Sequence, residues 1–134
     1  MGHYMRDLET KNKNQALVIE VDLFRASAAE AVRFRNILNM EIAGGYKNLV
    51  IDLTKCSFID SAFIGAIIVI KKKLELIDGQ LKIVITNKII QNATHLTRTI
   101  NVLNTFHSIH DALNNYNSSK VKVNVKTDQM CELV

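Results

Sequence analysis

Proline and tryptophan are absent from this 134-residue sequence, and only five glycines and two cysteines are present. These absences exclude a proline-rich linker and a collagen-like stretch, and no repeat period is visible. The longest uninterrupted apolar run covers residues 66–70. A membrane-spanning helix needs roughly 20 such residues. With 48% hydrophobic residues, the chain has the size and composition of one globular domain.

The scarce cysteines and the polar start of the chain favour a reduced compartment. Cys56 and Cys131 lie far apart, and nothing in the sequence requires a disulfide between them. Residues 1–15 are polar and charged, without the apolar core of a secretory signal. We therefore expect a cytoplasmic protein that is not inserted into a membrane.

The formal net charge of +4 does not indicate a nucleic-acid-binding protein. Such a protein would carry a dense basic face with interleaved aromatic residues. The single basic run is Lys71-Lys72-Lys73, and Glu75 and Asp78 follow it closely. We interpret this run as the solvated end of a helix, with a contact surface for a partner as the alternative.

Hydrophobic periodicity predicts alternating strands and helices. Residues 16–23 alternate as a strand with one solvated face. Ser27 and Glu30 form the pattern of a capping box, so a helix begins there and ends at Gly44-Gly45. A more apolar strand is predicted at residues 49–53, and the most apolar helix at residues 61–77. The inward stripe of that helix is Phe63, Ile67, Ile70, Leu74 and Ile77.

The second half continues the alternation. Asp78-Gly79 ends the apolar helix and leads into a strand at residues 81–85. Asn87 is predicted to cap a third helix that runs through Leu96. A weaker strand covers residues 101–106, and Ser108 begins a final helix.

This order predicts an α/β fold with a mostly parallel central sheet of about four to five strands packed against about four helices. We divide the chain into a polar segment 1–14 that could contain a short strand, one domain at 15–116, and a tail at 117–134. In the tail, Val121, Val123 and Val125 alternate with polar residues, which is typical of an edge strand; disorder is the alternative.

The chemically most distinctive feature is the pair Asp60-Ser61 at the start of the apolar helix. The first turn of a helix offers unpaired amides and a partial positive charge, which suit an anion such as phosphate. Aspartate and serine are also good helix caps, so simple capping is the alternative interpretation.

No other group of residues indicates chemistry. His107 and His110 are three residues apart, but a metal site needs further ligands. Ser61 is not flanked by the glycines of the Gly-x-Ser-x-Gly motif of hydrolases. Gly44-Gly45 lacks the Gly-Lys-Ser/Thr sequence that ends a phosphate-binding loop. We therefore expect no metal, no cofactor and no catalysis.

Three local patterns support a family resemblance. They are Val50-Ile51-Asp52-Leu53 leading through Phe58-Ile59-Asp60-Ser61 to Gly65; Gly79-Gln80-Leu81-Lys82-Ile83-Val84; and Val102-Leu103, Phe106, Ser108 and Ala112-Leu113. Together with the element order, they make residues 16–116 resemble a STAS domain, the fold of bacterial anti-sigma-factor antagonists. One departure is Ala62-Phe63-Ile64-Gly65, where the family usually has Ser or Thr followed by Gly-Leu-Gly.

The resemblance implies that Ser61 is the phosphorylated residue of a protein-interaction switch. Its partners would be an anti-sigma factor with serine kinase activity, which binds the unmodified protein, and a serine phosphatase. The expected partner-binding residues are Asp60, Ser61, Ala62, Phe63 and Ile64, with Phe63 exposed beside Ser61. Phosphoserine carries about −1.5 to −2 charges, enough to end such an interaction.

Two other functions of STAS domains remain as alternatives. One is an accessory subunit of a membrane lipid-transport ATPase complex, which would bind its transporter regardless of phosphorylation. The other is a sensor of a small molecule or lipid, which would need an apolar cavity.

Overall fold

A computed structural model describes residues 5–6, 16–92, 103–114 and 120–126. Its strands are β1 (Met5–Arg6), β2 (Ala16–Asp22), β3 (Arg25–Ala26), β4 (Asn48–Asp52), β5 (Phe58–Ile59), β6 (Gln80–Val84), β7 (Thr105–Phe106) and β8 (Lys120–Lys126). Its helices are α1 (Ala28–Ala43), α2 (Ser61–Glu75), α3 (Asn87–Asn92) and α5 (Ile109–Ala112).

Within the described residues, the main sheet has six strands in the order β1-β8-β2-β4-β6-β7, where four to five were predicted. Neighbouring strands pair in parallel, except that β1 pairs antiparallel with β8. The structure therefore confirms the predicted α/β fold with a mostly parallel sheet. A small second sheet joins β3 to β5, and it lies directly before the starts of α1 and α2.

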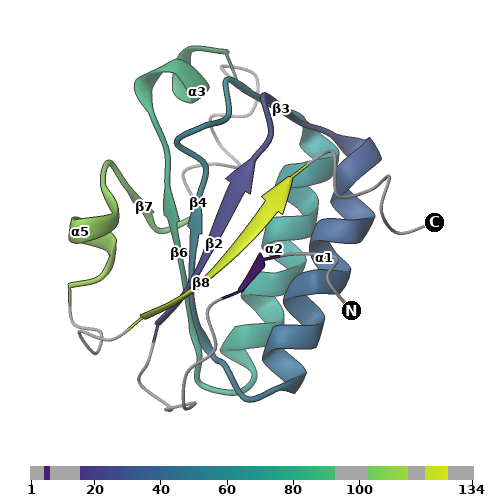
Figure 1. Ribbon diagram of the computed structural model, residues 1–134, viewed down its shortest axis with the longest axis vertical. Helices are drawn as coiled ribbons and strands as arrows, with labels where there is room; N and C mark the ends of the chain where they lie inside the picture. The colour runs from purple at the N-terminus through teal and green to yellow at the C-terminus, as the bar shows by residue number, and fades with distance from the viewer. Residues whose placement is uncertain (1–4, 7–15, 93–102, 115–119, 127–134) are drawn as a thin grey trace.

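The two long helices α1 and α2 lie side by side on one face of the sheet, and α5 lies on the other (Figure 1). The larger core fills the space under α1 and α2. On the opposite face, Val18, Val50 and Val84 pack against Ala112 of α5. The predicted solvated face of β2 is therefore only partly exposed. Val18 is buried there, while Glu20 and Asp22 lie 3.5 and 3.9 Å from the ammonium of Lys55.

The C-terminal strand lies inside the sheet instead of at its edge. β8 pairs with β2 over seven residue positions and with the short β1 on its other side. The alternation of Val121, Val123 and Val125 thus correctly indicated a strand. Its place between β1 and β2 was not predicted, since alternation alone does not specify the neighbouring strands. The main sheet therefore extends past residue 116.

Local capping residues define most helix starts. Glu30 accepts a hydrogen bond from the amide of Ser27 at 3.3 Å, as the predicted capping box requires, and another from the Ser27 hydroxyl at 2.8 Å. The hydroxyl of Ser108 accepts from the amide of Asp111 at 3.1 Å. The start of α3 differs from the prediction: Thr86 accepts from the amide of Ile89, and Asn87 is already helical. The predicted end of that helix, Leu96, lies outside the described residues.

The turn after α2 contains a residue with an unfavourable backbone conformation. Asp78 has φ of 59°, in the left-handed region that disfavours residues with a Cβ atom. The following Gly79 has a different constraint. A Cβ atom there would lie 2.3 Å from the carbonyl oxygen of Lys47. Glycine is thus required at position 79 because the backbone of Lys47 comes close to it. The strained backbone conformation is that of Asp78.

Replacing Asp78 with glycine is expected to raise the free energy of unfolding by about 0.5–1 kcal/mol, because glycine adopts positive φ without a steric cost. It also removes a negative charge near the C-terminal end of α2, where the helix dipole disfavours it. Urea unfolding measures the change. Asp78→Ala is the control, because it removes the charge but keeps the Cβ atom. Equal stability of the two variants would contradict backbone strain as the cause.

Candidate functional site

Asp60 connects the short strand β5 to α2 and caps that helix. Its backbone is extended, with φ of −102° and ψ of 174°, and its Oδ1 accepts a hydrogen bond from the amide of Phe63 at 2.9 Å. One of the unpaired amides at the start of α2 is thereby satisfied. The predicted capping role of this carboxylate is correct.

The same carboxylate also reaches the start of the neighbouring helix. Its Oδ2 accepts a hydrogen bond from the amide of Ala28, the first residue of α1, at 2.9 Å. The backbone amide of Asp60 donates to the carbonyl of Ala26 at 3.0 Å, which extends the β3–β5 pairing. The N-termini of α1 and α2 therefore converge on one carboxylate. The partial positive charges of both helices favour a negative group at this point.

Ser61 and Ala62 are the exposed residues of the first turn of α2. Ser61 directly follows Asp60 in the chain, and it is exposed to solvent. The residue next to the carboxylate that joins the two helices therefore lies at the surface.

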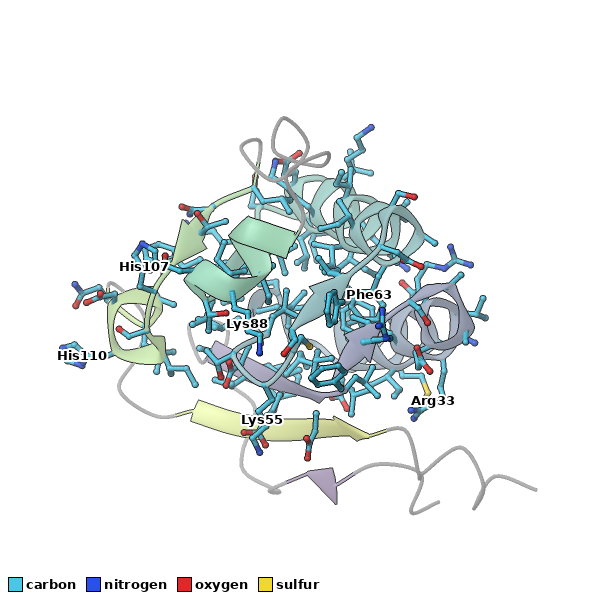
Figure 2. The ribbon with its side chains drawn as sticks, turned by 90° about the horizontal axis from the view of Figure 1, so that it is seen from above. Arg33, Lys55, Phe63, Lys88, His107 and His110 are labelled. Atoms are coloured by element: carbon cyan, nitrogen blue, oxygen red, sulfur yellow. The ribbon has the colours of Figure 1, made fainter. Side chains whose placement is uncertain are left out.

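The expectation that Phe63 is exposed beside Ser61 is wrong. Its side chain is 0% exposed, and Ile64 is also buried. Figure 2 shows Phe63 pointing into the interior, where its ring centroid lies 4.5 Å from that of Phe34 on α1. The helical period puts Phe63 on the same face as Ile67, which faces the core. Of the five expected partner-binding residues, Asp60, Ser61 and Ala62 reach the surface.

Comparisons with known proteins identify the family of this chain. The family model described as STAS domain matches residues 8–112, which is most of the chain. The chain belongs to the STAS domain family. A search of curated proteins finds no match for it.

Solved structures share the fold of this STAS domain. An anti-sigma factor antagonist from Mycobacterium paratuberculosis aligns with a TM-score of 0.61 and 18% identity, over 87% of this chain and 97% of the other. The anti-sigma factor antagonist SpoIIAA in its unphosphorylated form aligns with a TM-score of 0.59 and 12% identity, over 84% and 94%. The protein TM1081 aligns with a TM-score of 0.55 and 21% identity, over 69% of this chain and 78% of the other.

An aromatic cluster beside the Asp60-Ser61 pair was missed by the sequence reasoning. Phe24 is 61% exposed, and its ring meets that of Phe58 edge-on at a centroid distance of 5.5 Å. The guanidinium of Arg25 lies 4.3 Å from the centre of the Phe58 ring. Exposed aromatic residues and arginine are enriched where proteins bind each other. The only sequence signal was an apolar residue directly after a strand, where a polar turn is usual.

In the described part of this STAS domain, no other candidate residues form a site comparable to the Asp60-Ser61 surface. Within the part of the chain that the structure describes, no three His, Cys, Asp or Glu residues are placed to hold a metal ion. His107 and His110 are exposed at the surface near α5 (Figure 2). Cys56 is a buried free thiol, and burial raises its pKa to about 12. Among the described helices, none is long and apolar enough to span a membrane.

An apolar cavity lies between the start of α2 and the strands β4, β6 and β7. Its lining includes Leu53, Ile64, Ile83, Ile89, Leu103 and Thr105. The volume of about 10 Å³ accommodates little more than one water molecule. A lipid or a drug-sized ligand needs several hundred Å³. This cavity therefore does not support the ligand-sensing alternative.

Proposed function

We propose that this STAS domain is a non-enzymatic protein-interaction switch controlled by phosphorylation of Ser61. Its unmodified form binds an anti-sigma factor with serine kinase activity, which phosphorylates Ser61, and a serine phosphatase restores the binding form. The observation that carries the proposal is the exposed Ser61 hydroxyl directly beside Asp60, at the point where the starts of α1 and α2 meet. The family and the solved antagonist structures support the same function.

The chemistry of the site explains how one phosphate would release a partner. A phosphoserine at 61 places about −1.5 to −2 charges next to the Asp60 carboxylate. The two negative groups would compete for the same amides and the same helix dipoles. A partner docked over Ser61 would have to bury this charge, which costs several kcal/mol when no partner group pairs with it.

The surface available to that partner extends from α2 onto the β3–β5 sheet. It consists of Asp60, Ser61 and Ala62 together with Phe24 and Arg25. The exposed Phe24 ring provides apolar contact area, and Arg25 provides charge-assisted hydrogen bonds. Phe63 and Ile64 support this surface from below, as part of the core.

The test is a pull-down from a lysate of the source cells with wild type, Ser61→Asp and Ser61→Ala as parallel baits. We expect Ser61→Asp to retain at least about tenfold less anti-sigma factor, a loss of about 1.4 kcal/mol. Ser61→Ala is the matched control and should retain the partner, since it adds no charge. Incubation of the captured partner with ATP and wild type should place phosphate on Ser61, as detected by mass spectrometry.

Two results would contradict the proposal. Phosphate on a residue other than Ser61 would show that Ser61 is not the residue that controls binding. Equal capture of a transporter ATPase by all three baits would mean that Ser61 has only a structural role, as the first residue of α2. It would also favour the accessory-subunit function.

A further inference from the structure

The opposite end of the molecule carries large apolar side chains in contact with solvent. α1 and α2 both end there, and the turns that follow them form the lower end of the molecule in Figure 1. Leu76 is 86% exposed, Met40 is 60% exposed and Ile77 is 44% exposed. A hydrogen bond of 2.7 Å from Lys73 to the side chain of Asn39 joins the two helices at this level. The C-terminal part of α1, which carries Met40, is therefore in contact with the end of α2, which precedes Leu76 and Ile77.

The exposure of Ile77 differs from what the sequence pattern predicts, and Leu76 lies outside the predicted stripe. The apolar stripe of α2 was expected to continue inward to Ile77, but Leu74 is its last buried member. Beyond it the chain leaves the helix, and the amide of Gly79 bonds to the carbonyl of Leu74 at 2.7 Å. Leu76 and Ile77 thus lie on a turn that projects from the fold. Because they stay in contact with water in the isolated domain, these two large side chains do not provide the free energy that their full burial would give.

Basic side chains surround this apolar turn. Lys71, Lys72 and Lys73 occupy the last turns of α2, and Lys47 lies beside the same turn, with its carbonyl accepting from the amide of Gln80. The acidic residues near this turn are Glu75, which pairs with Lys71, and Asp78. Positive charge is therefore in excess around Leu76 and Ile77.

We propose that this end of the domain, defined by Met40, Leu76 and Ile77 with the surrounding lysines, binds the surface of an anionic lipid membrane. Leu76 and Ile77 enter the boundary between headgroups and acyl chains, and Lys47, Lys72 and Lys73 contact the lipid phosphates. This is the arrangement by which interfacial proteins combine buried apolar area with attraction to anionic lipids. The long lysine stems cover apolar surface while their ammonium groups stay in the headgroup layer.

The shape of the surface favours a membrane over a protein partner. A protein partner binds best where anchors fill a well-packed pocket, and such anchors are enriched in Trp, Tyr and Arg. Here the exposed apolar residues are aliphatic, and Leu76 and Ile77 lie on the turn that follows α2. Ser61 lies at the other ends of the same helices, so membrane binding leaves it accessible. The membrane surface and the proposed phosphorylation switch are independent.

The experiment is co-sedimentation of the full chain with vesicles of phosphatidylcholine, alone or mixed with phosphatidylglycerol. We expect wild type to sediment with the anionic vesicles and to remain in solution with the neutral ones. The double variant Leu76→Ser with Ile77→Ser should lose about tenfold in binding. Lys72→Gln with Lys73→Gln should lose a similar amount, and higher salt should weaken wild-type binding.

The matched control is Val32→Ser. It removes an apolar side chain that is 56% exposed near the start of α1, eight residues before Met40. Its vesicle binding should equal that of wild type. Circular dichroism verifies that each variant is folded, and all the substituted side chains except Ile77 are at least half-exposed or charged.

Three results would overturn the proposal. One is equal sedimentation of wild type with neutral and anionic vesicles, or none with either. Another is an equal loss in Val32→Ser, which would indicate nonspecific apolar attraction. The third is a wild-type dimer in analytical ultracentrifugation that dissociates in the Leu76→Ser, Ile77→Ser variant, because a second copy would then cover this surface.

Discussion

Replacing Phe63 with alanine is expected to lower the free energy of unfolding by about 3–5 kcal/mol, the usual cost of removing a buried phenylalanine ring. Phe63 is fully buried, and its ring packs against that of Phe34 between α1 and the sheet. The substitution removes this aromatic contact and leaves a cavity under the start of α2. A small domain has a total stability of about 5–15 kcal/mol, so the loss is a large part of it.

Urea unfolding monitored by circular dichroism measures this change. Phe63→Leu retains most of the apolar volume and should cost clearly less than the alanine variant. Val69→Ala, a truncation on the exposed side of the same helix, is the control and should change stability by less than about 0.5 kcal/mol. A loss below about 1 kcal/mol for Phe63→Ala would mean that the ring does not pack in the core as described.

Replacing Asp60 with alanine is expected to lower the free energy of unfolding by about 1–3 kcal/mol, because one carboxylate caps two helices. A single N-cap contributes roughly 0.5–2 kcal/mol. Asp60 accepts from Phe63 on α2 and from Ala28 on α1, so its removal leaves an amide at the start of each helix without its acceptor. The attraction between the carboxylate and both helix dipoles is lost as well.

The matched controls for Asp60 separate capping from charge. Asp60→Asn keeps one side-chain oxygen as an acceptor and should lose less stability than Asp60→Ala. Ser61→Ala removes the neighbouring exposed hydroxyl and should change stability by at most about 0.5 kcal/mol. Hydrogen exchange provides a local test: the amides of Ala28 and Phe63 should exchange faster in Asp60→Ala. Faster exchange at Phe63 alone would show that the carboxylate does not couple the two helices in solution.

Local sequence rules predicted most of the elements of this domain. The period-two alternation of β2 and the stripe of α2 correctly indicated their types, because each pattern follows from the geometry of its own backbone. Ser27 and Ser108 were recognised as helix starts, since their hydrogen bonds involve residues only three positions away. The Asp60-Ser61 pair was found in the same way. Its proposed role as a phosphorylation site came from the resemblance to the STAS family.

The features that sequence reasoning missed all depend on residues distant in the chain. Phe63 belongs to the predicted inward stripe, but it was also expected at the surface beside Ser61. Its ring is buried against Phe34, which is 29 positions earlier. Asp60 was expected to cap one helix and caps two, because the β3–β5 pairing brings Ala28 within reach. The place of β8 beside β2 likewise follows from pairing across the whole domain.

The sequence by itself determined the succession of strands and helices, the parallel α/β class and the position of the Asp60-Ser61 pair at a helix start. These follow from backbone periodicity and from capping bonds within one turn of chain. Only the tertiary structure decided which side chains around Ser61 reach solvent, and that Leu76 and Ile77 remain exposed. The physical reason is that burial depends on what packs against a side chain, and the packing residues come from distant parts of the chain.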